Sequence, residues 1–190
     1  KVPLAIPQVR RWDLRTPWLY QIQVRLLDDS GHVMDQAKRQ FGMRTVRQDV
    51  DSIPRGRLFL NGRQIKLRGA NTMGFEQQDV FQKDFPQLID DILLAKICNM
   101  NYLRLTQRPV QPEVYEYADR LGLMLQTDLP LFGCLRYNKF AEAVRQAEEM
   151  EQLVRGHPSN IMISYINEPF PNASGKPHRH LTRPDLEAFF

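Results

Sequence analysis

An acidic residue directly follows an apolar segment late in the chain. Residues 161–166 read IMISYI, and Asn167-Glu168-Pro169 comes next. A carboxyl group is one of the side chains that transfer protons in catalysis, and a carboxylate in a polar loop is the ordinary alternative. Glu168 is therefore a candidate general acid or base if its neighbours also carry functional groups.

Polar residues also follow three earlier segments that have the pattern of buried strands. Asn71 ends the first of these segments, Arg104 lies at the end of the second, and Asp128 ends the third. The carboxyl ends of parallel strands lie at one edge of a sheet, where functional groups of α/β proteins gather. Any one of these residues could be an ordinary loop residue, but together with Asn167 and Glu168 they predict a site at that edge.

The elements that must position these residues alternate between strand and helix. Over residues 65–166 the order is strand, helix, strand, helix, strand, helix, strand. Apolar residues recur at helical spacing after Asp84, a plausible N-cap, and after Pro112, in a segment that stops at Gly122. This alternation predicts a parallel sheet, either doubly wound or the first half of a (β/α)8 barrel. No GxGxxG or Walker motif is present, so the nucleotide-binding versions lose support.

The first fifty residues have a different pattern, that of antiparallel β-structure. In WLYQIQVRLL, residues 18–27, apolar and polar residues alternate, which predicts a half-buried strand. A second strand is expected around residues 33–41, and residues 41–47 could form another. Asn61-Gly62 predicts a tight hairpin, because a type I′ turn needs positive φ at both positions.

Composition excludes several classes of protein. Of the 190 residues, 42% are hydrophobic and 25% are charged, as in globular domains, and the net charge is +4. Lys and Arg are scattered, so we expect no nucleic-acid partner. No apolar segment approaches the ~20 residues of a membrane span, so we expect no membrane partner. Cys98 and Cys134 lack metal-ligand spacing, and the histidines of HRH (178–180) lie in a polar loop, so neither a metal nor a cofactor is predicted.

Three motifs resemble one enzyme family. FGMRTV (41–46), LFLNGRQIKLRGAN (58–71) and HPSNIMISYINEP (157–169) are similar to glycoside hydrolase family 2, which includes β-galactosidases, β-glucuronidases and β-mannosidases. The resemblance covers most of residues 12–169 in the family's order. It implies an α/β fold, the first half of a (β/α)8 TIM barrel preceded by the last strands of an immunoglobulin-like β-sandwich. The expected divisions are sandwich 1–48, linker 49–57 and barrel 58–190.

The resemblance also implies roles for the residues at the strand ends. Glu168 falls on the family's general acid/base, and Asn167 on the Asn that hydrogen-bonds the sugar 2-hydroxyl. Arg104 matches an Arg that shapes the floor of the site, and Asp128 stands where many members have a Glu. Asn71 is a further expected sugar contact. The implied reaction is hydrolysis of β-linked glycosides with retention, which needs a second carboxylate ~5–5.5 Å from the first as nucleophile.

The resemblance also has departures. The family's nucleophile follows the seventh strand, which this chain does not reach, and Asp128 has no nucleophilic role in the family. We therefore expect a fragment that is inactive alone. Thr72-Met73 stands where many members have His, Ile163-Ser164 replaces Trp-Ser, and Ile166 replaces Gly. These changes leave the sugar open and argue against a standard β-galactosidase.

Two other functions remain open from the sequence. One is a non-catalytic carbohydrate-binding scaffold with the same fold. The other is a structural or interaction domain in which Glu168 is a solvated carboxylate. The sequence gives no prediction for the sugar, the linkage, the oligomeric state or the cellular compartment.

Overall fold

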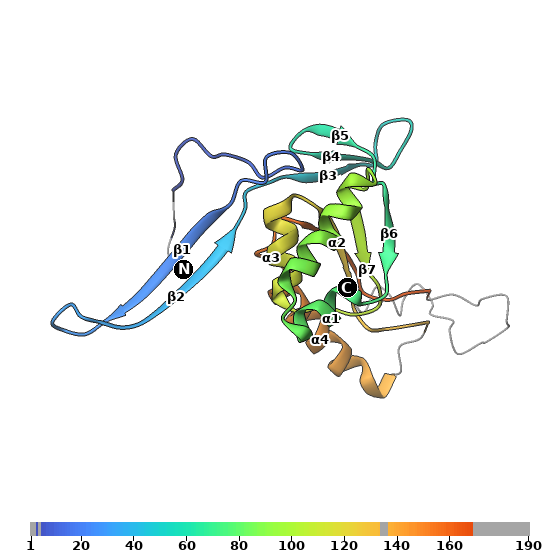
Figure 1. Ribbon diagram of the computed structural model, residues 1–190. Helices are drawn as coiled ribbons and strands as arrows, with labels where there is room; N and C mark the ends of the chain where they lie inside the picture. Colours follow the sequence, from blue (N-terminus) through green and yellow to red (C-terminus); the bar gives the residue numbers. More distant parts are fainter. Residues whose placement is uncertain (1–2, 4, 134–136, 169–190) are drawn as a thin grey trace.

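The computed structural model describes residues 3, 5–133 and 137–168, and these form three sheets and four α-helices (Figure 1). The strands are β1 (Tyr20–Leu27), β2 (Val33–Phe41), β3 (Val46–Asp49), β4 (Arg57–Leu60), β5 (Arg63–Ile65), β6 (Gly69–Thr72), β7 (Tyr102–Leu105), β8 (Met124–Asp128) and β9 (Asn160–Ser164). The helices are α1 (Phe75–Gln82), α2 (Phe85–Ile97), α3 (Pro112–Leu121) and α4 (Phe140–Val154), the last preceded by a 3₁₀ turn at Tyr137–Lys139.

Strands β1 and β2 form a two-stranded antiparallel hairpin that projects away from the helices (Figure 1). Both strands were predicted, but the half-burial expected for β1 is not observed. Val24 and Leu26 are 61% and 60% exposed. The alternation in the sequence prepares one face for burial, and the described residues supply no second sheet to cover it.

A three-stranded antiparallel sheet, in the order β3-β4-β5, follows the hairpin. Asn61 and Gly62 connect β4 to β5 with φ of 52° and 82°, which confirms the predicted turn. The expected strand in residues 41–47 becomes β3, which pairs with β4 and not with β2. The proposed division into residues 1–48, 49–57 and 58–190 stays a prediction.

The parallel sheet has the order β6-β7-β8-β9, with α1 and α2, α3, and α4 in the successive connections. The Asp84 side chain caps α2 by accepting from the Gln87 amide, and Gly122 ends α3 with φ of 71°. Both signals were predicted. The four parallel strands with their helices are the first half of a (β/α)8 barrel, as the sequence indicated.

Two features of this region differ from the prediction. The segment expected as one strand near residue 65 is two, β5 and β6, in different sheets. The Asn101 side chain separates them, because it donates to the Lys66 carbonyl and accepts from the Arg68 amide at 2.9 and 2.8 Å. Helix α1 was not predicted as a separate helix.

The main core lies between the parallel sheet and helices α2 and α3. Leu103 and Leu105 of β7 and Leu125 of β8 point into it, and Tyr115 of α3 is completely buried there. Because side chains alternate along a strand, the residues between them face the other side of the sheet. That other side would be the interior of the barrel. Among the described helices, none is long and apolar enough to cross a membrane.

Two long-range contacts fix the segment that leads into β9. The buried Asp119 carboxylate on α3 accepts from the Ser159 amide at 2.9 Å and contacts the His157 ring at 2.7 Å. From the N-terminal part of the chain, Arg44 donates to the carbonyls of Pro158 and Asn160 at 3.0 and 2.5 Å. The position of β9 is therefore set by α3 and by Arg44 together.

Candidate active site

Two charged side chains meet at the ends of neighbouring parallel strands, Arg104 on β7 and Asp128 on β8. Arg104 Nε lies 2.9 Å from Asp128 Oδ2 and 3.2 Å from Oδ1, and Arg104 Nη2 lies 2.6 Å from Oδ2. The Asp128 side chain is fully buried, while 22% of the Arg104 side chain is exposed. Of this pair, Arg104 is therefore the member that a ligand can contact.

The Asp128 carboxylate accepts two further hydrogen bonds. The Gln107 amide donates to Oδ2 at 3.1 Å, and Gln126 Nε2 donates to Oδ1 at 3.0 Å. Gln107 has a φ of 66°, a left-handed conformation that costs a non-glycine residue about 1–3 kcal/mol. Both carboxylate oxygens are thus held in place, and the chain adopts an unfavourable conformation where it donates to one of them.

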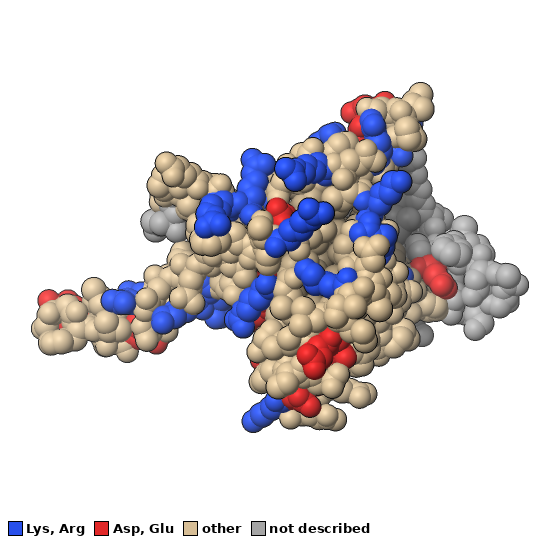
Figure 2. All heavy atoms as spheres, turned by 45° about the horizontal axis from the view of Figure 1, so that its top comes forward, with Lys and Arg blue, Asp and Glu red and all other residues tan. Residues whose placement is uncertain are grey.

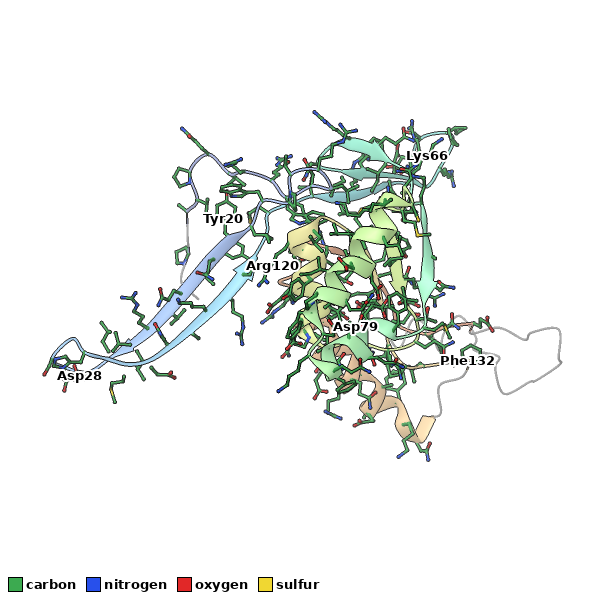
Figure 3. The ribbon with its side chains drawn as sticks, viewed as in Figure 1. Tyr20, Asp28, Lys66, Asp79, Arg120 and Phe132 are labelled. Carbon is green, nitrogen blue, oxygen red and sulfur yellow. The ribbon has the colours of Figure 1, made fainter. Side chains whose placement is uncertain are left out.

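Asn167 completes this network from the segment after β9. Its backbone amide donates to the Leu131 carbonyl at 2.8 Å, and its carbonyl accepts from the Gly133 amide at 2.7 Å. These bonds form a parallel bridge with Phe132, which lies beyond the end of β6 and on the opposite side of the molecule from Lys66 (Figure 3). Arg104 Nη2 donates to Asn167 Oδ1 at 2.8 Å. An Arg side chain has no acceptor, so the Asn167 Nδ2 group must face away from it.

Glu168 follows directly and is exposed, with a φ of 51°. Hydrogen bonds from Arg104 to Asp128 raise the pKa of the guanidinium, against the effect of its burial, and the negative charge of Glu168 adds to the rise. Glu168 therefore belongs to the same electrostatic environment as Arg104. It supplies an accessible carboxyl group beside fixed hydrogen-bond donors.

Asn71 lies on β6 directly beside Arg104 in the register of the two strands. Paired residues of neighbouring strands point to the same face, so Asn71 is on the barrel-interior side, where it is exposed. The structure thus brings all five predicted positions, Asn71, Arg104, Asp128, Asn167 and Glu168, to one end of the parallel sheet. Their individual roles stay predictions.

Sequence reasoning missed three residues of this network: Tyr102, Gln107 and Gln126. The signal for two of them was the strand period. Tyr102 precedes Arg104 by two residues, and Gln126 precedes Asp128 by two, so each shares a face with a predicted site residue. Gln107 gave no such signal, because its contribution is a backbone amide in a left-handed conformation.

No group of three His, Cys, Asp or Glu side chains that could hold a metal ion is found in residues 3, 5–133 and 137–168. Cys98 is a free, exposed thiol after α2. Cys134 and the histidines of residues 178–180 lie outside the described residues.

The family model described as the TIM barrel domain of glycosyl hydrolases family 2 matches residues 52–184, and a second model of the same family matches residues 1–44. The chain belongs to glycosyl hydrolase family 2. The resemblance seen in three sequence motifs is thereby confirmed, as is the barrel half of the fold.

Curated relatives of this family 2 chain are β-galactosidases. The chain is 28% identical over 186 residues to the enzyme of Psychromonas ingrahamii and 32% identical over 174 residues to that of Pseudoalteromonas haloplanktis. The matches cover 93% and 87% of this chain but only 17% and 16% of those proteins. The chain therefore spans about a sixth of the length of these relatives.

Solved family 2 structures share the fold. A β-glucuronidase from Ruminococcus gnavus in complex with D-glucuronic acid superposes with a TM-score of 0.70 and 25% identity, over 95% of this chain and 29% of that one. A Bacteroides uniformis β-glucuronidase superposes with a TM-score of 0.74 and 24% identity, over 96% of this chain and 21% of that one.

Proposed function

We propose that the full-length protein containing this chain hydrolyses O-glycosidic bonds of β-linked sugars with retention of configuration. The observation that carries the proposal is the position of Glu168, an accessible carboxyl group next to Asn167 and within the field of Arg104 at the strand ends. Family membership and the β-galactosidase and β-glucuronidase names of the relatives support it.

In this proposal Glu168 is the general acid/base. Its protonated form donates a proton to the leaving glycosidic oxygen, and its ionised form then takes a proton from the attacking water. The nucleophile is a second carboxylate outside residues 1–190. The mechanism requires no cofactor.

The remaining residues bind the sugar or hold the residues that bind it. The Asn167 amide oxygen accepts from Arg104, so its Nδ2 group is oriented to donate to a sugar hydroxyl oxygen, the 2-hydroxyl by family resemblance. Asn71 and the exposed part of Arg104 offer further donors. Asp128 was predicted as a sugar contact, but its complete burial favours an indirect role through Arg104.

The test is hydrolysis of a panel of aryl β-glycosides by the full-length protein and its Glu168→Ala variant. We expect about a 10²–10⁴-fold loss of kcat on substrates with poor leaving groups, the usual contribution of a positioned acid or base. Azide should restore turnover on an activated substrate and give a glycosyl azide. Glu149→Ala removes an exposed carboxylate of α4 that pairs with Arg145, and it should leave activity unchanged. Full activity of Glu168→Ala would refute the assignment.

Residues 1–190 alone should not hydrolyse glycosides, because the second carboxylate is missing. Turnover by the purified 190-residue chain that disappears in its Glu168→Ala variant would contradict this. A non-catalytic sugar-binding scaffold is the second candidate, favoured by the fact that the Arg104–Asn167 contact forms without the second carboxylate. Sugar binding by a full-length protein that cleaves no glycoside would support it.

A further inference from the structure

The Asp128 carboxylate is linked to a second layer of side chains on the barrel-interior face. Gln126 Nε2 donates to Asp128 Oδ1 at 3.0 Å, and the Tyr102 hydroxyl is hydrogen-bonded to Gln126 Oε1. The same hydroxyl lies 3.9 Å from the Met162 sulfur on β9. Gln126 and Tyr102 are therefore joined to the strand ends through one carboxylate.

The chemistry of these groups fixes the direction of every hydrogen bond. An ionised carboxylate only accepts, so the NH₂ group of Gln126 must face Asp128 and its Oε1 must face Tyr102. The Tyr102 hydroxyl must then be the donor. Arg104 only donates, so its two bonds to Asp128 and its bond to Asn167 Oδ1 complete a chain with one possible arrangement.

The chain of contacts is protected from solvent at its centre and anchored at its far end. Asp128 is fully buried, and burial raises the pKa of the Tyr102 hydroxyl to about 12, so Tyr102 keeps its donor proton at neutral pH. Gln126 is beside Arg104 in the register of β7 and β8. A loss of the Gln126 contact would leave Asp128 Oδ1 with only the 3.2 Å contact to Arg104 Nε.

We propose that Gln126 and Tyr102 are positioning residues, which hold Asp128 so that Arg104 directs the Asn167 amide toward the ligand. What this arrangement serves rests on the proposed function, in which Asn167 contacts the sugar. Neither Gln126 nor Tyr102 acts on the substrate itself. The bonds set by Gln126 and Tyr102 end at Asn167, the residue next to Glu168.

The first experiment is a double-mutant cycle in the full-length protein with Gln126→Met, which keeps the side-chain length, and Tyr102→Phe, which removes one hydroxyl. Hydrogen bonds to the sugar strengthen in the transition state, so the loss should appear mainly in kcat. We expect kcat to fall about tenfold in Gln126→Met and about threefold in Tyr102→Phe. The double variant should be no slower than Gln126→Met, because Tyr102 acts through Gln126.

Thr127→Val is the matched control for a merely structural effect. Thr127 is the residue between Gln126 and Asp128 in β8, but its hydroxyl faces the core and bonds to Tyr115 and Asn160 at 3.0 and 2.7 Å. This variant should lower the melting temperature and leave kcat within about twofold. A Gln126→Met variant that behaves like Thr127→Val, with lower stability and normal kcat, would overturn the proposal.

The second readout does not depend on activity. In a crystal structure of the full-length Gln126→Met protein, we expect the Arg104 Nη2 to Asn167 Oδ1 separation to exceed 3.5 Å. An unchanged 2.8 Å contact would show that Gln126 positions nothing. If the wild-type protein cleaves no glycoside, the proposed function fails, and this structural comparison still decides whether Gln126 positions Asn167.

Discussion

Glu76 is a buried carboxyl group on the inward side of α1, with only 2% of the residue exposed. Neither carboxylate oxygen has a hydrogen-bond partner among the described residues. Burial raises the pKa of Glu76, and the neighbouring Thr72 only partly opposes that rise. Asp79 on the same helix also has a raised pKa, from burial and from the negative charge of Asp91 on α2.

We expect Glu76→Gln to stabilise the protein at pH 7. The native state binds the Glu76 proton more tightly than the unfolded state, so the free energy of unfolding falls as pH rises above the unfolded pKa of about 4.3. Removal of the charge should raise the melting temperature at pH 7, and the gain should disappear near pH 4, where both states are largely protonated.

Glu142→Gln is the control for this pH dependence. Hydrogen bonds from Arg145 hold the pKa of Glu142 at about 2, so its carboxylate is favoured in the native state and its removal should give no gain at pH 7. A melting temperature of Glu76→Gln equal to that of the wild type at pH 7 would contradict the prediction.

At the residue scale, the sequence predicted which positions gather but not how each is used. Asn71, Arg104, Asp128, Asn167 and Glu168 were found because polar residues at parallel strand ends share an edge. The burial of Asp128 could not be predicted, because it depends on donors from Gln107 and Gln126 that only the folded chain brings to it.

Helix α3 and the segment before β9 depend on one another through Asp119. Its two carboxylate oxygens serve the Ser159 amide and the His157 ring, and its backbone carbonyl accepts from Trp12 Nε1 at 2.7 Å. One residue thus joins α3 to the strand that carries Asn167 and Glu168.

Asp119→Ala should therefore destabilise the protein by about 3 kcal/mol, because it leaves buried donors without an acceptor. Chemical denaturation of the two proteins measures the change. Glu116→Ala is the matched control on the same helix. It removes a partly exposed ion pair with Arg120, of a kind worth about 0–1 kcal/mol. Equal stabilities of the two variants would show that Asp119 does not hold β9.

At the element scale, the predictions succeeded where local signals act and failed where packing decides. The N-cap Asp84, the stop at Gly122 and the turn at Asn61-Gly62 are local. Helix α1 escaped prediction because it buries Glu76 and Asp79 where an amphipathic helix would bury apolar residues. The break between β5 and β6 escaped because it is made by Asn101, more than thirty residues away.

The whole molecule has surfaces that residues 3, 5–133 and 137–168 do not cover. In that part of the chain, the outer edges of β6 and β9 pair with no further strand, and the β1–β2 hairpin extends from the body (Figure 1). Basic side chains are abundant on the face turned forward in Figure 2, but neutral atoms lie between them. The uncovered surfaces are therefore backbone edges and apolar faces.

We expect the isolated 190-residue chain to self-associate through these surfaces, because open sheet edges and exposed apolar residues favour intermolecular contact. Sedimentation velocity of the purified chain measures its association. Val24→Lys with Leu26→Lys should reduce it, since both side chains are more than half exposed on one face of β1.

Gln21→Lys with Gln23→Lys adds the same charge to the opposite face of the same strand and serves as control. A chain that is monomeric at micromolar concentration before any substitution would contradict this prediction. A control that reduces association as much as Val24→Lys with Leu26→Lys would show that charge alone, and not the apolar face, is responsible.

The Arg44 contacts with Pro158 and Asn160 have a consequence for protein engineering. Arg44 belongs to the part of the chain that precedes the barrel, yet it holds the backbone that enters β9. A chimera that takes its N-terminal domain from one family member and its barrel from another would therefore keep the strand in place only if the crossover lies before residue 44. A crossover after Arg44 would have to exchange residues 158–160 as well, so the recombination unit and the structural domain do not coincide.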